Sequence, residues 1–154
     1  MIPSMIEAHL RQKHQGFEHH VHPAVMTAQE LAATEHVSGR RVAKPVVIRM
    51  AGNLALAVIA ATERLNLAAL EEATGLSVEL VAESEFAPRF APCDRGAEPP
   101  LALFGVPIFM DLKLEQERTL LMPAGTHQDA VLLDTREWMA CERAQPVFNL
   151  GVVA

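Results

Sequence analysis

Lys44 is the first residue of this chain whose surroundings suggest chemistry. It is the only charged residue within the apolar run Val42–Ile48. A lone cation is costly to bury, so its ammonium must reach a carboxylate or a pocket that accepts an anion. Pro45 follows directly and favours an edge position or a bulge, because proline cannot donate to a strand ladder. The alternative is an edge-strand lysine that points into water.

A second segment, Gly96–Pro100, combines a glycine with two prolines. We expect a rigid loop in which Gly96 takes a positive φ. Such a loop can aim backbone N–H groups at a ligand or at a developing oxyanion. The same composition is also typical of a turn that has no functional role.

A third segment, Gly125-Thr126-His127, follows an expected strand and turn. It offers one hydroxyl and one imidazole at an expected sheet end, where a histidine can position water or bind a substrate hydroxyl. A purely structural histidine is the alternative.

Four histidines lie close together near the N-terminus, namely His14, His19, His20 and His22. Adjacent strand residues point to opposite faces, and no carboxylate or cysteine completes a regular ligand spacing. The chain has no Gly-x-Ser-x-Gly motif and no phosphate-binding glycine motif, and Cys93 and Cys141 form no Cys-x-x-Cys pair. We therefore expect no metal, no cofactor and two free thiols.

The length of 154 residues and a hydrophobic content of 50% predict one domain, residues 1–154, whose core needs no disulfide or metal. No apolar run is long enough to span a bilayer and no signal-peptide pattern is present, so we expect a soluble, cytoplasmic protein. The net charge of -6 argues against nonspecific coating of nucleic acid. Residues 1–50 nevertheless carry six Lys/Arg and four Asp/Glu, and Arg40 and Arg41 lie close to Lys44 in sequence.

The order of apolar and turn residues predicts alternating helices and strands. Capping boxes at Thr27-Ala28-Gln29-Glu30 and Asp134-Thr135-Arg136-Glu137 begin two helices. Other predicted elements are a helix near residues 2–10, a helix over 67–73 that Asn66 caps and Gly75 closes, a helical turn from Ser84, a hairpin of 42–50 with 54–60, and strands at 17–22, 78–81, 106–110, 119–122 and, last, 130–133. The expected fold class is α+β, a curved, mixed, largely antiparallel sheet flanked by short helices.

These segments resemble the YbaK/EbsC family, which includes the editing domain inserted in bacterial prolyl-tRNA synthetases and its freestanding relatives. The resemblance runs from about Phe17 to Trp138. It rests on Thr27–Ala32 leading to Ala43-Lys44-Pro45, on Gly96–Pro100 continuing to Asp111, and on Ala124–His127. Two departures touch the pocket wall: Pro45 replaces a small polar residue, and Leu101-Ala102 replaces the usual Phe-Gly after Pro100.

The resemblance implies a trans-editing aminoacyl-tRNA deacylase, which hydrolyses the ester of a mischarged tRNA without a metal or a protein nucleophile. It implies a small amino acid on tRNA of the proline type, with a synthetase or an elongation factor as a further partner. Lys44 and Gly96 would act in catalysis, and Arg40 and Arg41 would bind tRNA. The residues implied to bind substrate are Pro99, Gly125, Thr126 and His127.

Two other readings of the sequence stay open. One is a noncatalytic module that uses the same pocket to bind an aminoacyl or nucleotide ligand or tRNA. The other is an interaction protein with a vestigial cleft, in which Lys44, Gly96 and His127 would lie far apart.

Overall fold

The computed structural model describes residues 1–154 and has the predicted α+β fold, with five short helices and ten strands. The helices are α1 (Ser4–Gln12), α2 (Ala28–Thr34), α3 (Leu67–Thr74), α4 (Glu83–Phe86) and α5 (Thr135–Glu142). The strands are β1 (Phe17–Val21), β2 (Ala43–Met50), β3 (Asn53–Ala60), β4 (Glu63–Leu65), β5 (Val78–Leu80), β6 (Ile108–Asp111), β7 (Thr119–Pro123), β8 (Asp129–Asp134), β9 (Gln145–Val147) and β10 (Gly151–Val153). Four 3-10 turns complete it: η1 (Gly39–Arg41), η2 (Ala87–Phe90), η3 (Ala102–Phe104) and η4 (Leu112–Gln116).

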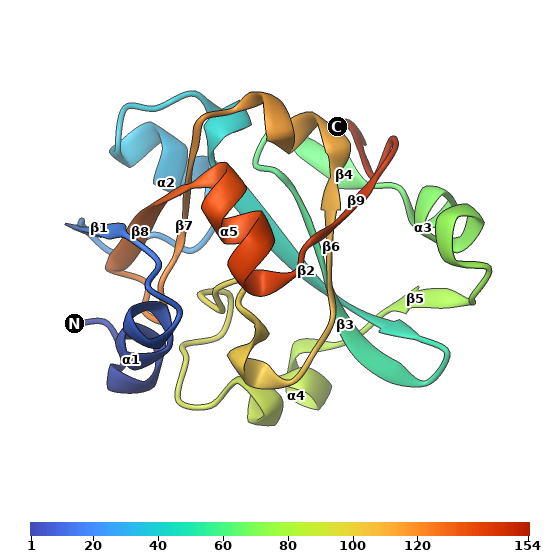
Figure 1. Ribbon diagram of the computed structural model, residues 1–154, viewed down its shortest axis with the longest axis horizontal. Coiled ribbons are helices and arrows are strands. Elements are labelled where there is room, and N and C mark those ends of the chain that lie inside the picture. The colour runs from blue at the N-terminus through green and yellow to red at the C-terminus, as the bar shows by residue number, and fades with distance from the viewer.

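The strands are mixed and largely antiparallel as predicted, but they divide into three sheets instead of one. The largest has the order β5-β2-β3-β6-β9, and the others are β1-β8-β7 and β10-β4. Only the β3–β6 and β6–β9 pairs are parallel. The two larger sheets meet at a parallel bridge between Val42 and Leu121, just before β2 begins. In Figure 1, the β1-β8-β7 sheet lies on the opposite side of the molecule from α3.

The main core lies among α1, α5 and the inner faces of the two larger sheets. It contains 23 buried residues, including Ile6 and Leu10 of the predicted apolar stripe of α1 and Ile2, which lies just before this helix. Trp138 of α5 is fully buried and donates its indole N–H to the Pro100 carbonyl at 2.9 Å. The indole therefore packs in the core while its polar atom keeps a partner. This contact anchors the end of the 96–100 loop to α5.

The predicted hairpin forms as β2 and β3, and its tight turn holds Ala51 and Gly52 at positive φ. Both predicted N-caps also form: Thr27 accepts from the Glu30 N–H, and Asp134 from the Glu137 N–H.

The second hydrogen bond predicted for each capping box, from the N-cap backbone N–H to the glutamate carboxylate, does not form. The Glu30 carboxylate accepts from the Met26 N–H and from the Thr27 hydroxyl, and the Glu137 carboxylate accepts from the Gly16 N–H. Neither carboxylate accepts from the backbone N–H of its own N-cap residue. Asn66 occupies the predicted N-cap position of α3, but its side chain makes no capping hydrogen bond and donates to the Asn149 carbonyl instead.

Three short strands, β4, β9 and β10, were not predicted from the sequence. Each has three residues, too few to show a period of two. Residues 130–133 were predicted as the last strand, yet β9 and β10 follow α5. Strand β9 even contains Pro146, and it forms because β6 supplies a parallel partner.

Two buried carboxylates join segments that are distant in sequence. Asp129 accepts hydrogen bonds from the Met1 amino group, His19 and Thr126. Glu142 on α5 accepts from His9 and Gln15, both at 2.8 Å, and from the Ala102 N–H at 2.7 Å. Burial raises the pKa of Asp129, but these hydrogen bonds outweigh burial and lower its pKa from 3.8 to about 2.

Glu142→Ala removes the shared acceptor of His9, Gln15 and Ala102. Because the donors left behind are largely buried, we expect the free energy of unfolding to fall by about 3 kcal/mol. Urea denaturation measures this loss. Glu72→Ala, at an exposed position on α3, is the control and should change stability by less than about 0.5 kcal/mol. Equal effects of the two substitutions would contradict this account of Glu142.

Asp129→Asn tests the low pKa of the other carboxylate. A lowered folded-state pKa stabilises the protein above the unfolded value of 3.8, and this stabilisation disappears as pH falls toward about 2. At pH 7 we expect the variant to lose about 2 kcal/mol. The difference from wild type should shrink as pH falls from about 4 to 2. A constant difference across that range would show that the charge of Asp129 is not what stabilises the fold.

Candidate functional site

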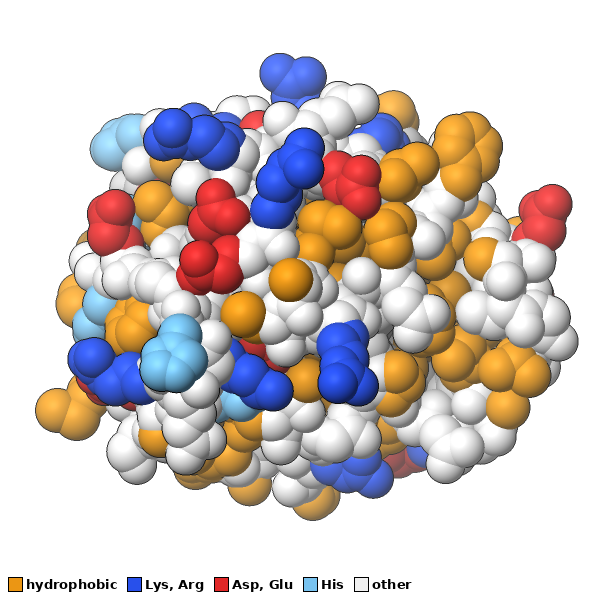
Figure 2. All heavy atoms as spheres, in the orientation of Figure 1, with side chains coloured by type: hydrophobic (Ala, Val, Ile, Leu, Met, Phe, Trp, Pro, Cys, Tyr) orange, Lys and Arg blue, Asp and Glu red, His pale blue; other side chains and the backbone are white.

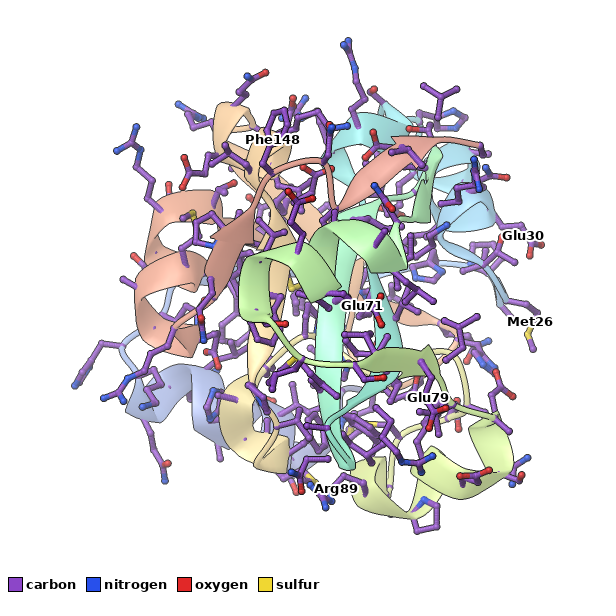
Figure 3. All side chains as sticks on the ribbon, turned by 90° about the vertical axis from the view of Figure 1, so that its right-hand side faces the viewer. Met26, Glu30, Glu71, Glu79, Arg89 and Phe148 are labelled. Carbon is purple, nitrogen blue, oxygen red and sulfur yellow. The ribbon has the colours of Figure 1, made fainter.

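A cavity of about 240 Å³ opens between α2, the first residues of β2, the Gly96 loop and the β7–β8 turn. Figure 3 shows Met26, which also lines this cavity, and Glu30 projecting at the α2 edge of the molecule, away from Phe148. The lining comprises His22, Val25, Met26, Thr27, Ala28, Leu31, Ala43, Lys44, Pro45, Gly96, Ala97, Pro123, Thr126, His127 and Asp129. Three segments that are far apart in sequence therefore meet at one place.

The cavity forms where β2 has a partner on only one side. Strand β3 pairs with the whole of β2, whereas β5 pairs only with Ile48–Met50. Lys44 and Pro45 therefore lie at an open edge, as the proline predicted. The missing N–H of Pro45 costs no hydrogen bond there.

Lys44 is half-buried at the cavity wall, and its ammonium donates to the Glu63 carbonyl at 2.6 Å. It forms no ion pair, because the Glu63 carboxylate binds Lys113 instead. Burial lowers the pKa of Lys44, and the nearby charge of Glu63 opposes this only in part. An anion in the cavity would favour the charged ammonium, which is the behaviour expected of an anion-binding lysine.

Gly96 takes the predicted left-handed conformation, with φ +86°. Its N–H, however, donates to both carboxylate oxygens of Glu98 at 3.1 Å, and the Ala97 N–H donates to the Asp94 carbonyl at 3.0 Å. The loop therefore uses both N–H groups internally and does not aim them at a ligand, as the Gly96 segment was expected to do. Glu98 is buried, and burial raises its pKa although backbone hydrogen bonds oppose the shift.

Gly125 joins the turn to the Gly96 loop and does not line the cavity. Its φ is +96°, and a Cβ there would lie 2.8 Å from side-chain atoms of Ile6 and Pro3. Its N–H donates to the Ala97 carbonyl and its carbonyl accepts from the Asp94 N–H, both at 2.8 Å. Glycine is required because α1 packs against this position.

Thr126 and His127 both line the cavity and are held in place. The Thr126 hydroxyl donates to Asp129, while His127 Nε2 lies 2.7 Å from the Arg95 carbonyl. The carbonyl can only accept, so Nε2 carries the hydrogen. The backbone N–H of Thr126 has no acceptor within the protein. It is therefore a free donor in a residue of the cavity wall.

The structure thus brings Lys44, Gly96, Thr126 and His127 together, which is contrary to a scattered, vestigial cleft. Three other residues assigned to the site lie outside the cavity lining. Pro99 is buried, and Arg40 and Arg41 lie exposed in η1. Arg41 donates to the Thr119 hydroxyl at 3.2 Å and lies 3.9 Å from the Glu117 carboxylate.

Three polar residues of the lining, His22, Thr27 and Asp129, were not identified as site residues from the sequence. His22 was noticed only as part of the histidine cluster. In the structure His19 binds Asp129 and His20 binds Glu35, so carboxylates take up two of the four histidines. No group of three or more His, Cys, Asp or Glu side chains is placed to hold a metal ion.

On the face shown in Figure 2, Lys and Arg side chains are scattered among Asp and Glu and form no continuous basic patch. None of the helices has the length and apolar character needed to cross a membrane.

Comparison with known proteins agrees with the fold. A structure from work on epitope backbone grafting by computational design, for presentation of linear epitopes on scaffold proteins, matches with a TM-score of 0.81 at 17% identity, over 98% of this chain and 97% of its own. Hypothetical protein APE2540 matches with a TM-score of 0.86 at 19% identity, over 96% and 99%. A candidate trans-editing enzyme for prolyl-tRNA synthetase matches with a TM-score of 0.79 at 19% identity, over 93% and 92%.

At these identities the structural matches show a shared fold. A search of curated protein sequences finds no significant match. The model of the aminoacyl-tRNA editing domain matches residues 22–141, a range that includes every residue of the cavity lining. The chain therefore belongs to the aminoacyl-tRNA editing domain family.

Proposed function

We propose that this protein is a trans-editing deacylase, which hydrolyses the ester between a small, wrongly attached amino acid and the terminal adenosine of a tRNA. The observation that carries the proposal is the position of Lys44, an unpaired and half-buried cation in a cavity of about 240 Å³. A cation there suits the phosphate of a tRNA 3′ end. The limited volume suits a terminal nucleoside and a small side chain better than a larger part of the tRNA.

In this reaction water adds to the ester carbonyl, and the tetrahedral intermediate then breaks its bond to the ribose oxygen, which takes up a proton. Lys44 holds the phosphate and orients the 3′ end. The free Thr126 N–H is the donor best suited to the carbonyl oxygen as it becomes negative. Gly96 acts through its carbonyl, which accepts no hydrogen bond from the protein and so can orient the water.

The remaining residues act by shaping the cavity. His127 and Gly125 hold the turn that presents Thr126, and Pro99 supports the Gly96 loop from within the core. A cysteine nucleophile is disfavoured, because burial raises the pKa of Cys93 to about 12 and leaves almost no thiolate at neutral pH.

Arg40 and Arg41 are proposed to contact the tRNA backbone outside the cavity, where both are exposed. On binding, the Arg41 guanidinium would replace its 3.9 Å ion pair with the Glu117 carboxylate by a contact with a tRNA phosphate. The absence of a continuous basic patch on the face shown in Figure 2 suits a brief encounter in the cytoplasm, in which the cavity binds only the 3′ end of the tRNA. The structural match to a candidate trans-editing enzyme for prolyl-tRNA synthetase supports tRNA of the proline type, with a synthetase or an elongation factor delivering it.

A second function is favoured by one observation. The internal use of the Gly96 N–H by Glu98 removes a donor that catalysis was expected to need. A noncatalytic module would bind an aminoacyl-nucleotide in the same cavity without releasing the amino acid, so turnover separates the two functions.

A panel of mischarged tRNAs tests the deacylase proposal. We expect release of a small amino acid from at least one tRNA, and Lys44→Ala should lower kcat/KM by about 100-fold. The control is Lys13→Ala, which removes an exposed lysine outside the cavity. Absence of release by the wild type, or equal release by the Lys44 variant, would reject the proposal. Ligand-induced thermal stabilisation without release would instead indicate the binding module.

Chelation tests the metal-free mechanism. Because Lys44 and backbone groups carry the proposed chemistry, treatment with EDTA followed by desalting should leave the deacylation rate unchanged. The measurement is the initial rate before and after treatment. A loss of rate that added Zn²⁺ restores would contradict the mechanism.

A further inference from the structure

His22 is a buried polar residue of the cavity for which neither the fold nor the proposed reaction has yet supplied a role. It follows β1 directly, and only 6% of its surface is exposed. Its backbone N–H donates to the Gln128 carbonyl at 2.9 Å, and three residues later the Val25 N–H donates to the His127 carbonyl at 2.9 Å. These bonds hold the 22–25 segment against the turn that carries Thr126 and His127.

One nitrogen of the His22 ring is satisfied and the other is not. Nδ1 lies 2.8 Å from the Pro23 carbonyl, which can only accept, so Nδ1 carries a hydrogen. Nε2 is buried and has no hydrogen-bond partner. A buried imidazolium without a carboxylate would be more costly than the neutral ring, so Nε2 presents a lone pair.

An unpaired acceptor in this position is unusual within the molecule. Only two other buried side-chain atoms lack a partner, Gln15 Oε1 and Thr135 Oγ1, and neither residue lines the cavity. Buried polar groups normally have partners, so an exception calls for an explanation, and in a residue of a binding cavity a partner supplied by the ligand is one such explanation. His22 is the lining residue that is more than nine-tenths buried and also has a buried polar atom without a partner.

We propose that His22 Nε2 accepts a hydrogen bond from an O–H group in the bound complex and thereby positions the reacting ester. The inference rests on the proposed deacylase function, in which two O–H groups come near the ester: the free hydroxyl of the terminal ribose and the attacking water. An ammonium donor is less well matched, because the carboxylate of Asp129 lines the same cavity and attracts a cation more strongly than a neutral imidazole does.

Two substitutions of His22 test the contributions of its two ring nitrogens separately. His22→Asn places an amide N–H near the position of Nδ1, so it can keep the bond to Pro23, but it has no acceptor at the Nε2 position. His22→Gln can place its carbonyl oxygen near the Nε2 position. We expect kcat/KM to fall about 30-fold in the Asn variant and to recover to within about 3-fold of wild type in the Gln variant. Equal melting temperatures would show that the loss is not one of folding.

A deoxy substrate identifies which O–H group is bound. If it is the ribose hydroxyl, replacing the free terminal hydroxyl of the tRNA by hydrogen should lower the kcat/KM of the wild type by the same factor. On that deoxy substrate, His22→Asn should then cause no further fall in kcat/KM. If it is the attacking water, His22→Asn should lower kcat equally on both substrates. An Asn variant as active as wild type on the unmodified substrate would overturn the proposal.

A binding measurement keeps this test separate from the test of deacylation. The wild-type protein, labelled with ¹⁵N in its histidines, is titrated with adenosine carrying an amide-linked alanine, which cannot be hydrolysed at the ester. We expect a shift of the His22 Nε2 resonance, which the Asn variant identifies by its absence. If the wild type binds the probe without that shift, the His22 proposal fails whatever the deacylation assay shows. If the shift occurs but no tRNA is deacylated, the deacylase function fails and His22 remains a ligand-binding residue.

Discussion

The site depends on the unequal pairing of β2. One edge of this strand is covered by β3 throughout, while the other is covered by β5 only at Ile48–Met50. Just before the N-terminal end of β2, Val42 forms a single bridge to Leu121 of the β1-β8-β7 sheet. The two sheets diverge between these contacts, so Lys44 and Pro45 face a cavity instead of another strand. A proline at this edge costs no hydrogen bond and also prevents further strand pairing.

The walls of the cavity are then held by bonds between backbone groups. The Gly96 loop and the Gly125 turn exchange two hydrogen bonds of 2.8 Å, and the 22–25 segment is bonded to the same turn. Asp129 ties the Thr126 hydroxyl to His19 of β1. Three connections that would be mobile alone thus support one another. Such mutual support is what a site needs in order to orient a substrate before reaction.

The polar groups of the site divide into those satisfied by the fold and those left for a ligand. The Gly96 N–H and the Thr126 hydroxyl have internal partners, whereas the Thr126 N–H and His22 Nε2 have none. Lys44 is intermediate, since a carbonyl accepts from it but no carboxylate neutralises it. Natural proteins depart from local consistency mainly at functional sites. The location of these unsatisfied groups in one cavity is therefore the structural argument for a ligand there.

Sequence alone determined the elements with strong local signals and the identity of the main site segments. The apolar stripe of α1, the β2–β3 hairpin and the two N-caps follow from spacing within a few residues, and the unusual cation Lys44 was visible among its apolar neighbours. The short strands β4, β9 and β10 depended on partners distant in sequence, so no local pattern could reveal them. The same limit applied to the site: whether Glu98 or a ligand receives the Gly96 N–H, and which nitrogen of His22 is left unpaired, is decided by packing between segments. Only the tertiary structure brings those donors and acceptors within reach, because hydrogen bonds act over about 3 Å whereas sequence separation places no limit on spatial distance.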